Sequence, residues 1–266
     1  MWDIKVLDLG SLEIDGSRTV ATRPPGTRVR LPVQGFLLVG PEHVVVVDTG
    51  FRHPDVLQRI GLRGFAGAEQ NLDAQLRAHG VKFADVRYVL HTHLHLDHAG
   101  QTDQFPLTTT AVVNRRELEY SVSGLSGGSY PPEDVKHLVD RLHTAGSLRL
   151  LDLDATDEHV LPGIRCSAAG GHTEGSMVVY VETAMGLACL CGDIVYNVAD
   201  QLLAKGVLEG DPIVSGSHVT ARRSEKAAIK RVLNSPASLL YPGHDKPAKI
   251  VRGATTEMAP KTYEPM

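Results

Sequence analysis

Cysteine is scarce in this chain, and long apolar runs are absent. Its 266 residues include three cysteines, Cys166, Cys189 and Cys191, and so sparse and odd a set does not form a disulfide framework. No apolar run approaches the roughly 20 residues that a membrane-spanning helix needs, and the first residues lack the basic and then apolar pattern of a secretory signal. We therefore expect a protein of a reducing compartment, the cytoplasm, without a membrane partner.

Surplus positive charge and aromatic residues are also missing. Lys and Arg number 27 against 31 Asp and Glu, a net charge of −4, so no basic excess is available to neutralise the phosphates of a nucleic acid. Aromatic residues make up 5% of the chain, and no groove for a long acyl chain can be recognised. With 42% hydrophobic residues, the chain can still bury a sizeable core. These values predict a globular protein that does not bind nucleic acid.

Histidine, by contrast, is concentrated in one segment. Residues 91–100 read His-Thr-His-Leu-His-Leu-Asp-His-Ala-Gly, with four histidines and one carboxylate. Because side chains alternate along an extended chain, His93 and His95 point to one side, and Asp97 and His98 then point elsewhere. One loop can therefore supply ligands to two neighbouring metal ions. Imidazole and carboxylate ligands suit Zn, Fe, Mn or Co.

Strand and helix patterns place this loop in an α/β fold. Strand-like runs cover residues 4–9, 36–39, 44–47, 86–90, 148–151, 164–168, 177–181, 187–191 and 239–241. Helical patterns cover residues 72–80, 114–120, 131–146 and 220–233. The Gly- and Ser-rich segment 121–129 reads as a loop and not as a domain boundary, because candidate ligands lie on both sides of it. The order predicts one domain over residues 1–266, an αβ/βα sandwich of two mixed β-sheets with helices outside and a dinuclear metal site at one edge.

Three further segments place metal-binding side chains directly after strands. His172 follows Gly-Gly, Asp193 follows Cys-Gly, and His244 follows Pro-Gly. Together with His-x-His-x-Asp-His at 93–98, this set resembles the metallo-β-lactamase superfamily. The resemblance implies two divalent metal ions, with Zn²⁺ as the first expectation. It implies that His93, His95 and His172 bind one ion, that Asp97, His98 and His244 bind the other, that Asp193 bridges both, and that Asp48 supports the loop through hydrogen bonds.

Within the superfamily the chain is similar to the N-acyl-homoserine lactonase group, from its opening strands to about residue 250. Leu-Pro-Val at 31–33 before a strand, the loop at 92–100, Asp-x-x-Tyr at 193–196 and Gly-His-Asp at 243–245 have counterparts there. The resemblance implies a homodimer that opens a lactone by attack of a metal-bridging hydroxide, with the Tyr196 hydroxyl near the substrate carbonyl and Asp97 as proton shuttle. Gly170 replaces the usual proline, and segments 51–67 and 197–217, expected to border the pocket, do not closely match the group.

Several alternatives stay open at this point. The substrate is an N-acyl-homoserine lactone, an aromatic lactone of the pyridoxolactone kind, or another cyclic ester. A glyoxalase II-like thioesterase shares the seven ligands, but only about twenty residues follow His244, where that enzyme has a helical extension. A catalytically silent metal-binding sensor is the alternative that is not an enzyme. We expect His91 to be structural, Cys191 to fill a strand face, and His218 to lie at the pocket rim.

Overall fold

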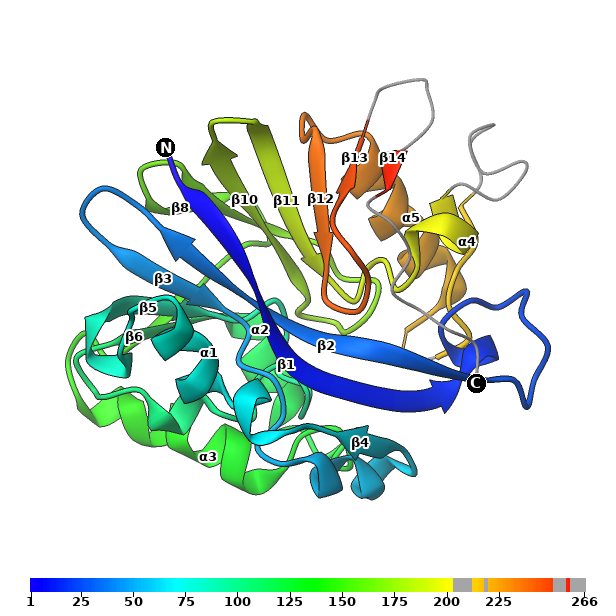
Figure 1. Ribbon diagram of the computed structural model, residues 1–266, viewed down its shortest axis with the longest axis horizontal. Helices are drawn as coiled ribbons and strands as arrows, with labels where there is room; N and C mark the ends of the chain where they lie inside the picture. Colours follow the sequence, from blue (N-terminus) through cyan, green and yellow to red (C-terminus); the bar gives the residue numbers. More distant parts are fainter. Residues whose placement is uncertain (203–211, 218–219, 251–256, 259–266) are drawn as a thin grey trace.

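Two seven-stranded sheets face each other in the computed structural model, which describes residues 1–202, 212–217, 220–250 and 257–258 (Figure 1). The first sheet contains β1 (Asp3–Asp15), β2 (Arg28–Val39), β3 (Val44–Val47), β4 (Arg63–Phe65), β5 (Val86–Leu90), β6 (Thr110–Asn114) and β7 (Leu148–Leu151), in the order β4-β1-β2-β3-β5-β6-β7. The second contains β8 (Glu158–Leu161), β9 (Ile164–Ala168), β10 (Met177–Thr183), β11 (Gly186–Gly192), β12 (Leu239–Pro242), β13 (Ala248–Lys249) and β14 (Glu257–Met258), in the order β14-β13-β12-β11-β10-β9-β8.

Each sheet combines parallel and antiparallel pairs. In the first sheet β1, β2 and β3 are antiparallel neighbours, whereas β3, β5, β6 and β7 run parallel. In the second sheet β11 and β12 form the parallel pair, and the other neighbours are antiparallel. The predicted sandwich of two mixed sheets is therefore confirmed.

Alternation along the strands assigns side chains to the layers. On β2, Phe36 and Leu38 pack against the second sheet, while Leu37 packs on the opposite face. On β10, Val179 joins the layer between the sheets, while Val178 faces outward. The helices α1 (Leu72–Ala78), α2 (Arg115–Ser121) and α3 (Pro132–Asp140) lie beyond the first sheet, and α4 (Val198–Leu202) and α5 (Arg222–Leu233) lie beyond the second (Figure 1).

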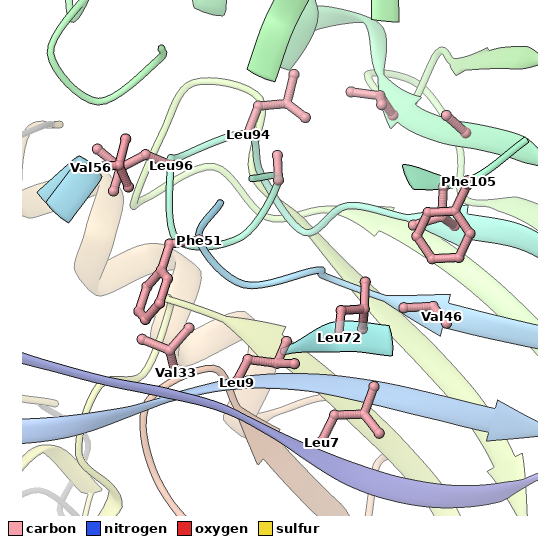
Figure 2. Close-up of a cluster of buried hydrophobic side chains, with 14 of the residues drawn as sticks. Leu7, Leu9, Val33, Val46, Phe51, Val56, Leu72, Leu94, Leu96 and Phe105 are labelled. Carbon is pink, nitrogen blue, oxygen red and sulfur yellow. The ribbon is translucent and has the colours of Figure 1, made fainter. Parts of the chain in front are cut away.

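The largest apolar cluster reaches from the first sheet to the histidine loop. Figure 2 shows Leu94 and Leu96 of that loop among side chains that include Leu9, Phe51 and Val56. Both leucines are fully buried, and each such burial contributes about 1.5–3 kcal/mol. Because these leucines alternate with the histidines, anchoring them in the core turns the His93 and His95 side chains away from it.

The element bounds differ from the predicted ones in informative places. The helix predicted to reach residue 146 ends at Asp140, because the chain turns into a 3-10 helix (Arg141–His143) and the buried Arg141 guanidinium donates to the carbonyl oxygens of Phe105 (2.7 Å) and Thr109 (2.9 Å). The Leu-Pro-Val segment at 31–33 lies within β2 and not before a strand. None of the helices in the described ranges is long and apolar enough to cross a membrane. That residues 1–266 form one domain stays a prediction.

Candidate metal centre

The seven predicted ligands come together at one edge of the sandwich, where strands end. Each of them follows a strand directly or within a few residues: the histidine loop follows β5, His172 follows β9, Asp193 follows β11 and His244 follows β12. All are buried, none more than 8% exposed. Their ligand atoms form three groups, each within 4.8 Å: His93, His95 and His172; His93, His98 and Asp193; Asp97, His98 and His244.

The Asp193 carboxylate stands between the two outer groups. Its Oδ2 lies 3.5 Å from His172 Nε2 and 4.0 Å from His93 Nε2. Its Oδ1 lies 3.1 Å from His98 Nε2 and 3.3 Å from His244 Nε2. One oxygen thus faces each histidine set, as a bridging carboxylate requires.

The outer nitrogens of the rings are held by neighbours. His98 Nδ1 lies 2.9 Å from Asp48 Oδ2, and His244 Nδ1 lies 2.7 Å from the carbonyl oxygen of Pro32. His93 Nδ1 lies 3.2 Å from Thr92 Oγ1. A hydrogen bond to one ring nitrogen orients the imidazole and its tautomer, so the Nε2 atoms of these rings point toward the cluster.

Several inward atoms lack a hydrogen bond among the described residues. They are the Nε2 atoms of His93 and His98 and Asp193 Oδ1, whereas His95 turns its Nδ1 inward, 2.9 Å from His172 Nε2. Buried polar atoms of this kind are costly unless something satisfies them, and a divalent cation would do so. An all-nitrogen-and-oxygen donor set of this composition suits a divalent transition metal, so the residues fit the two ions that the sequence predicts.

The electrostatics of the cluster point the same way. Burial lowers the pKa of His95 to about 3, so its imidazole is neutral and able to act as a ligand near neutral pH. Burial opposes ionisation of Asp97, but His98 and His244 outweigh it and lower the pKa of Asp97 to about 2. Although burial disfavours its charged form, Asp193 and Asp97 raise the pKa of His244 to about 10. The His95 imidazole is thus neutral, the Asp97 carboxylate is ionised, and the carboxylates of the cluster favour positive charge beside them.

Asp48 anchors the histidine loop from the side of β3. It is fully buried and accepts from Thr92 N–H (2.9 Å) and Thr92 Oγ1 (2.6 Å) in addition to its contact with His98. Its φ of +58° is a left-handed conformation that is uncommon outside glycine and that Asp tolerates better than most residues. The support that the resemblance implied for Asp48 is therefore present as hydrogen bonds.

Glu117 holds two ligand loops together, and sequence reasoning missed it. This buried side chain accepts from Leu94 N–H (2.9 Å), Thr173 Oγ1 (2.6 Å) and Tyr130 OH (3.0 Å). Leu94 lies between two predicted ligands, and Thr173 follows a third. The only signal in the sequence, Asn at the start of α2 with Glu three residues on, is typical of a helix cap and therefore conceals this role.

A cavity opens on the cluster and is bordered by the segments expected to border it. Segment 51–67 contributes Ile60 and Leu62 to the cavity wall, and segment 197–217 contributes Ser217. Tyr196 lines the cavity as well. The Tyr196 hydroxyl lies 3.3 Å from His172 Nδ1, and its ring stacks on His244. Burial and then Asp193 raise the pKa of Tyr196, which keeps the phenol protonated.

The remaining expectations resolve in different ways. His91 is buried, with Nε2 3.0 Å from Thr102 Oγ1, and it belongs to none of the metal-holding groups found among the described residues. Cys191 packs in the apolar layer under the outer helices of the second sheet. His218 lies outside the described residues.

Comparison with known proteins agrees with this geometry. A model of the metallo-beta-lactamase superfamily matches residues 28–244. An N-acyl homoserine lactonase of Bacillus cereus is 26% identical over 246 residues, which cover 89% of this chain and 90% of the relative. An N-acyl homoserine lactonase AttM of Azorhizobium caulinodans is 32% identical over 149 residues, 50% of this chain and 55% of the relative.

Solved structures show the same fold. An N-acyl homoserine lactone hydrolase with N-hexanoyl-L-homoserine at its catalytic metal centre superposes with a TM-score of 0.73 at 23% identity, covering 91% of this chain and 92% of the other. AidC, a dizinc quorum-quenching lactonase, superposes with a TM-score of 0.68 at 16% identity, covering 99% and 95%. Because the superfamily model spans most of the chain, this protein belongs to the metallo-β-lactamase superfamily.

Proposed function

We propose that the protein is a metal-dependent lactonase, an ester hydrolase that opens a cyclic ester, with two Zn²⁺ ions at its edge site. The observation that carries the proposal is the Asp193 carboxylate, whose two oxygens face the two histidine sets, beside a cavity that Tyr196 lines. The curated relatives named above are N-acyl homoserine lactonases, which favours an N-acyl-homoserine lactone as the first substrate to examine.

The seven candidate ligands divide between the two ions according to the groups that their side chains form. His93, His95 and His172 would hold one ion, Asp97, His98 and His244 the other, and Asp193 would contact both. Bound there, such ions supply Lewis acidity for a carbonyl oxygen and lower the pKa of water to near neutrality.

Tyr196 provides the hydrogen-bond donor for the substrate carbonyl oxygen, and Asp97 provides the group that transfers the proton. Both line the cavity. The Tyr196 hydroxyl donates a hydrogen bond to the substrate carbonyl oxygen as negative charge develops on it. Asp97 accepts the proton of the attacking water and returns it to the ring oxygen when the acyl carbon–oxygen bond breaks, so the products are a free hydroxyl and a carboxylate.

The test is proton release by zinc-loaded protein offered acyl-homoserine lactones, simple γ-lactones, aromatic lactones and a glutathione thioester, each with a chelated control. We expect metal-dependent opening of at least one lactone, and the panel then ranks the substrates. Turnover of the thioester alone would replace the proposal by a glyoxalase II-like thioesterase. Saturable binding of a lactone without turnover would replace it by a sensor.

A further inference from the structure

A half-buried arginine lines the cavity at the candidate site, and its charge reaches the Asp15 carboxylate only at a distance beyond that of an ion pair. Arg18 ends the 3-10 helix Gly16–Arg18 and lines the same cavity as Asp97, Asp193 and Tyr196. Among the described residues, no carboxylate oxygen lies within 4.0 Å of its guanidinium, and the guanidinium donates no hydrogen bond. Other arginines that are similarly sheltered do have partners: Arg23 pairs with Asp200, and Arg52 pairs with Asp103 and Asp134.

The acid nearest to Arg18 in sequence is already engaged. Asp15 accepts from Ser17 N–H (2.9 Å) and Ser17 Oγ (2.8 Å) through one oxygen, and from Gly26 N–H (2.7 Å) through the other. Its two oxygens are thus committed to closing the turn after β1. The Arg18 guanidinium remains available to a group that enters the cavity.

The backbone around Arg18 is held on the cavity rim. Gly216 N–H donates to the Arg18 carbonyl oxygen (3.2 Å), and Ala21 N–H donates to the Val214 carbonyl oxygen (2.9 Å). The two segments approach so closely that a Cβ on Gly216 would collide with the Ser17 carbonyl oxygen. Because Ser217 of the same segment also lines the cavity, Arg18 is part of a built wall and not of a free surface turn.

The rest of the wall supplies little polarity outside the metal centre. Its aliphatic side chains are Leu12, Ile14, Leu31, Ile60 and Leu62, and two serines, Ser129 and Ser217, complete it. One cation in a part of the wall that is otherwise aliphatic apart from two serines favours a ligand with an apolar segment and one anionic group. A carboxylate matches the planar fork of a guanidinium, and partial desolvation strengthens the pair.

We propose that Arg18 binds a carboxylate carried by the substrate, so that the preferred lactone is an anionic one with an aliphatic segment between its ring and its charge. This inference rests on the proposed lactonase function and narrows its substrate class. Hydrogen bonds to charged groups are worth enough to give the carboxylate an advantage of about 10- to 100-fold over a neutral isostere.

The experiment compares a γ-lactone bearing a carboxyalkyl chain with its primary amide, using zinc-loaded wild-type protein, Arg18→Ala, Arg18→Lys and Arg30→Ala. Arg30 is a matched control, because it is an exposed cation on β2 whose guanidinium lies over the Phe65 ring and it does not line the cavity. We expect the wild type to favour the carboxylate about 10- to 100-fold in kcat/KM, mainly through KM. Arg18→Ala should lose this preference while its kcat on the amide is kept, Arg18→Lys should keep part of it, and Arg30→Ala should keep all of it.

Calorimetric binding of the ring-opened dicarboxylate to the same four proteins provides a readout independent of turnover. If lactones are opened with no preference for the carboxylate, or if Arg18→Ala keeps the preference, the Arg18 inference is wrong and the lactonase proposal stands. If no lactone is opened, the lactonase proposal fails, and binding still decides the role of Arg18: equal affinity of wild type and Arg18→Ala overturns it, and a loss of about 10-fold or more upholds it as an anion site.

Discussion

Removing the Glu117 carboxylate should destabilise the protein and loosen its metal centre. In Glu117→Ala, three donors lose their acceptor: Leu94 N–H, Thr173 Oγ1 and Tyr130 OH, at 2.9, 2.6 and 3.0 Å. Hydrogen bonds to a charged group contribute about 1.5–3 kcal/mol each. Burial raises the pKa of Glu117, so the carboxylate itself bears a desolvation cost that offsets part of this sum. We expect a net loss of about 3 kcal/mol in the free energy of unfolding, comparable to the removal of one member of a buried pair.

The assay is thermal unfolding of the zinc-loaded proteins, together with their zinc content. For a chain of this size, a loss of about 3 kcal/mol lowers Tm by about 6–12 °C. Glu117→Gln is the matched control, because its amide oxygen can still accept from Leu94 N–H and Tyr130 OH while its amide nitrogen donates to the Thr173 hydroxyl. It should lose less than half as much. A Glu117→Ala protein that keeps its zinc and unfolds within about 1 kcal/mol of wild type would refute the reasoning.

Three further predictions follow from the site and its surroundings. Gly175→Ala should destabilise the protein, since its Cβ would overlap the Glu117 backbone, whereas Gly127→Ala, where a Cβ meets open space, should not; urea unfolding of both variants checks this. Burial raises the pKa of Asp134 from 3.8 to about 6, so the folded state holds this proton more tightly than the unfolded chain does. The stability of wild type relative to Asp134→Asn should therefore fall by up to about 3 kcal/mol as pH rises from about 4 to about 6, and a difference that is constant with pH would contradict this. Tyr196→Phe should lower kcat on an opened lactone by about 10²-fold at unchanged zinc content, and an unchanged kcat would remove Tyr196 from the reaction.

Much of the fold could be predicted because buried strands read as short apolar runs. The runs at 44–47 and 177–181 correspond to β3 and β10, and the β10 side chains divide between two layers. The short strands β4, β13 and β14, of three, two and two residues, escaped prediction, since a period cannot be read over so few positions. The early end of α3 depends on a buried guanidinium that binds distant carbonyl oxygens, which no local pattern indicates.

The candidate ligands of the metal centre could be predicted from the sequence, whereas the residues around them could not. Its seven side chains could be named from the sequence because their motifs resemble those of the metallo-β-lactamase superfamily, and each of them follows a strand. Their roles as ligands remain the proposal made above. Glu117 and Arg18 could not be found in this way, since each is one charged residue among many in the sequence. Their positions depend on contacts with residues far along the chain, Thr173 for Glu117 and Gly216 for Arg18.

Asp48 and Glu117 hold the candidate ligand loops in place through hydrogen bonds that lie outside the cluster of ligand atoms. Asp48 ties Thr92 and His98 to the end of β3, and Glu117 ties Leu94 to Thr173 on the second sheet's side. The Asp48 oxygens accept from Thr92 and contact the outer nitrogen of His98, and the Glu117 oxygens accept from Leu94, Thr173 and Tyr130. The Nε2 atoms of His93 and His98 are buried without a hydrogen bond. The loops are thus fixed by hydrogen bonds that a metal ion does not replace, and the unsatisfied atoms are the ones a metal ion would contact. Such separation lets the centre be preorganised, because a cation need not order the loops in order to bind.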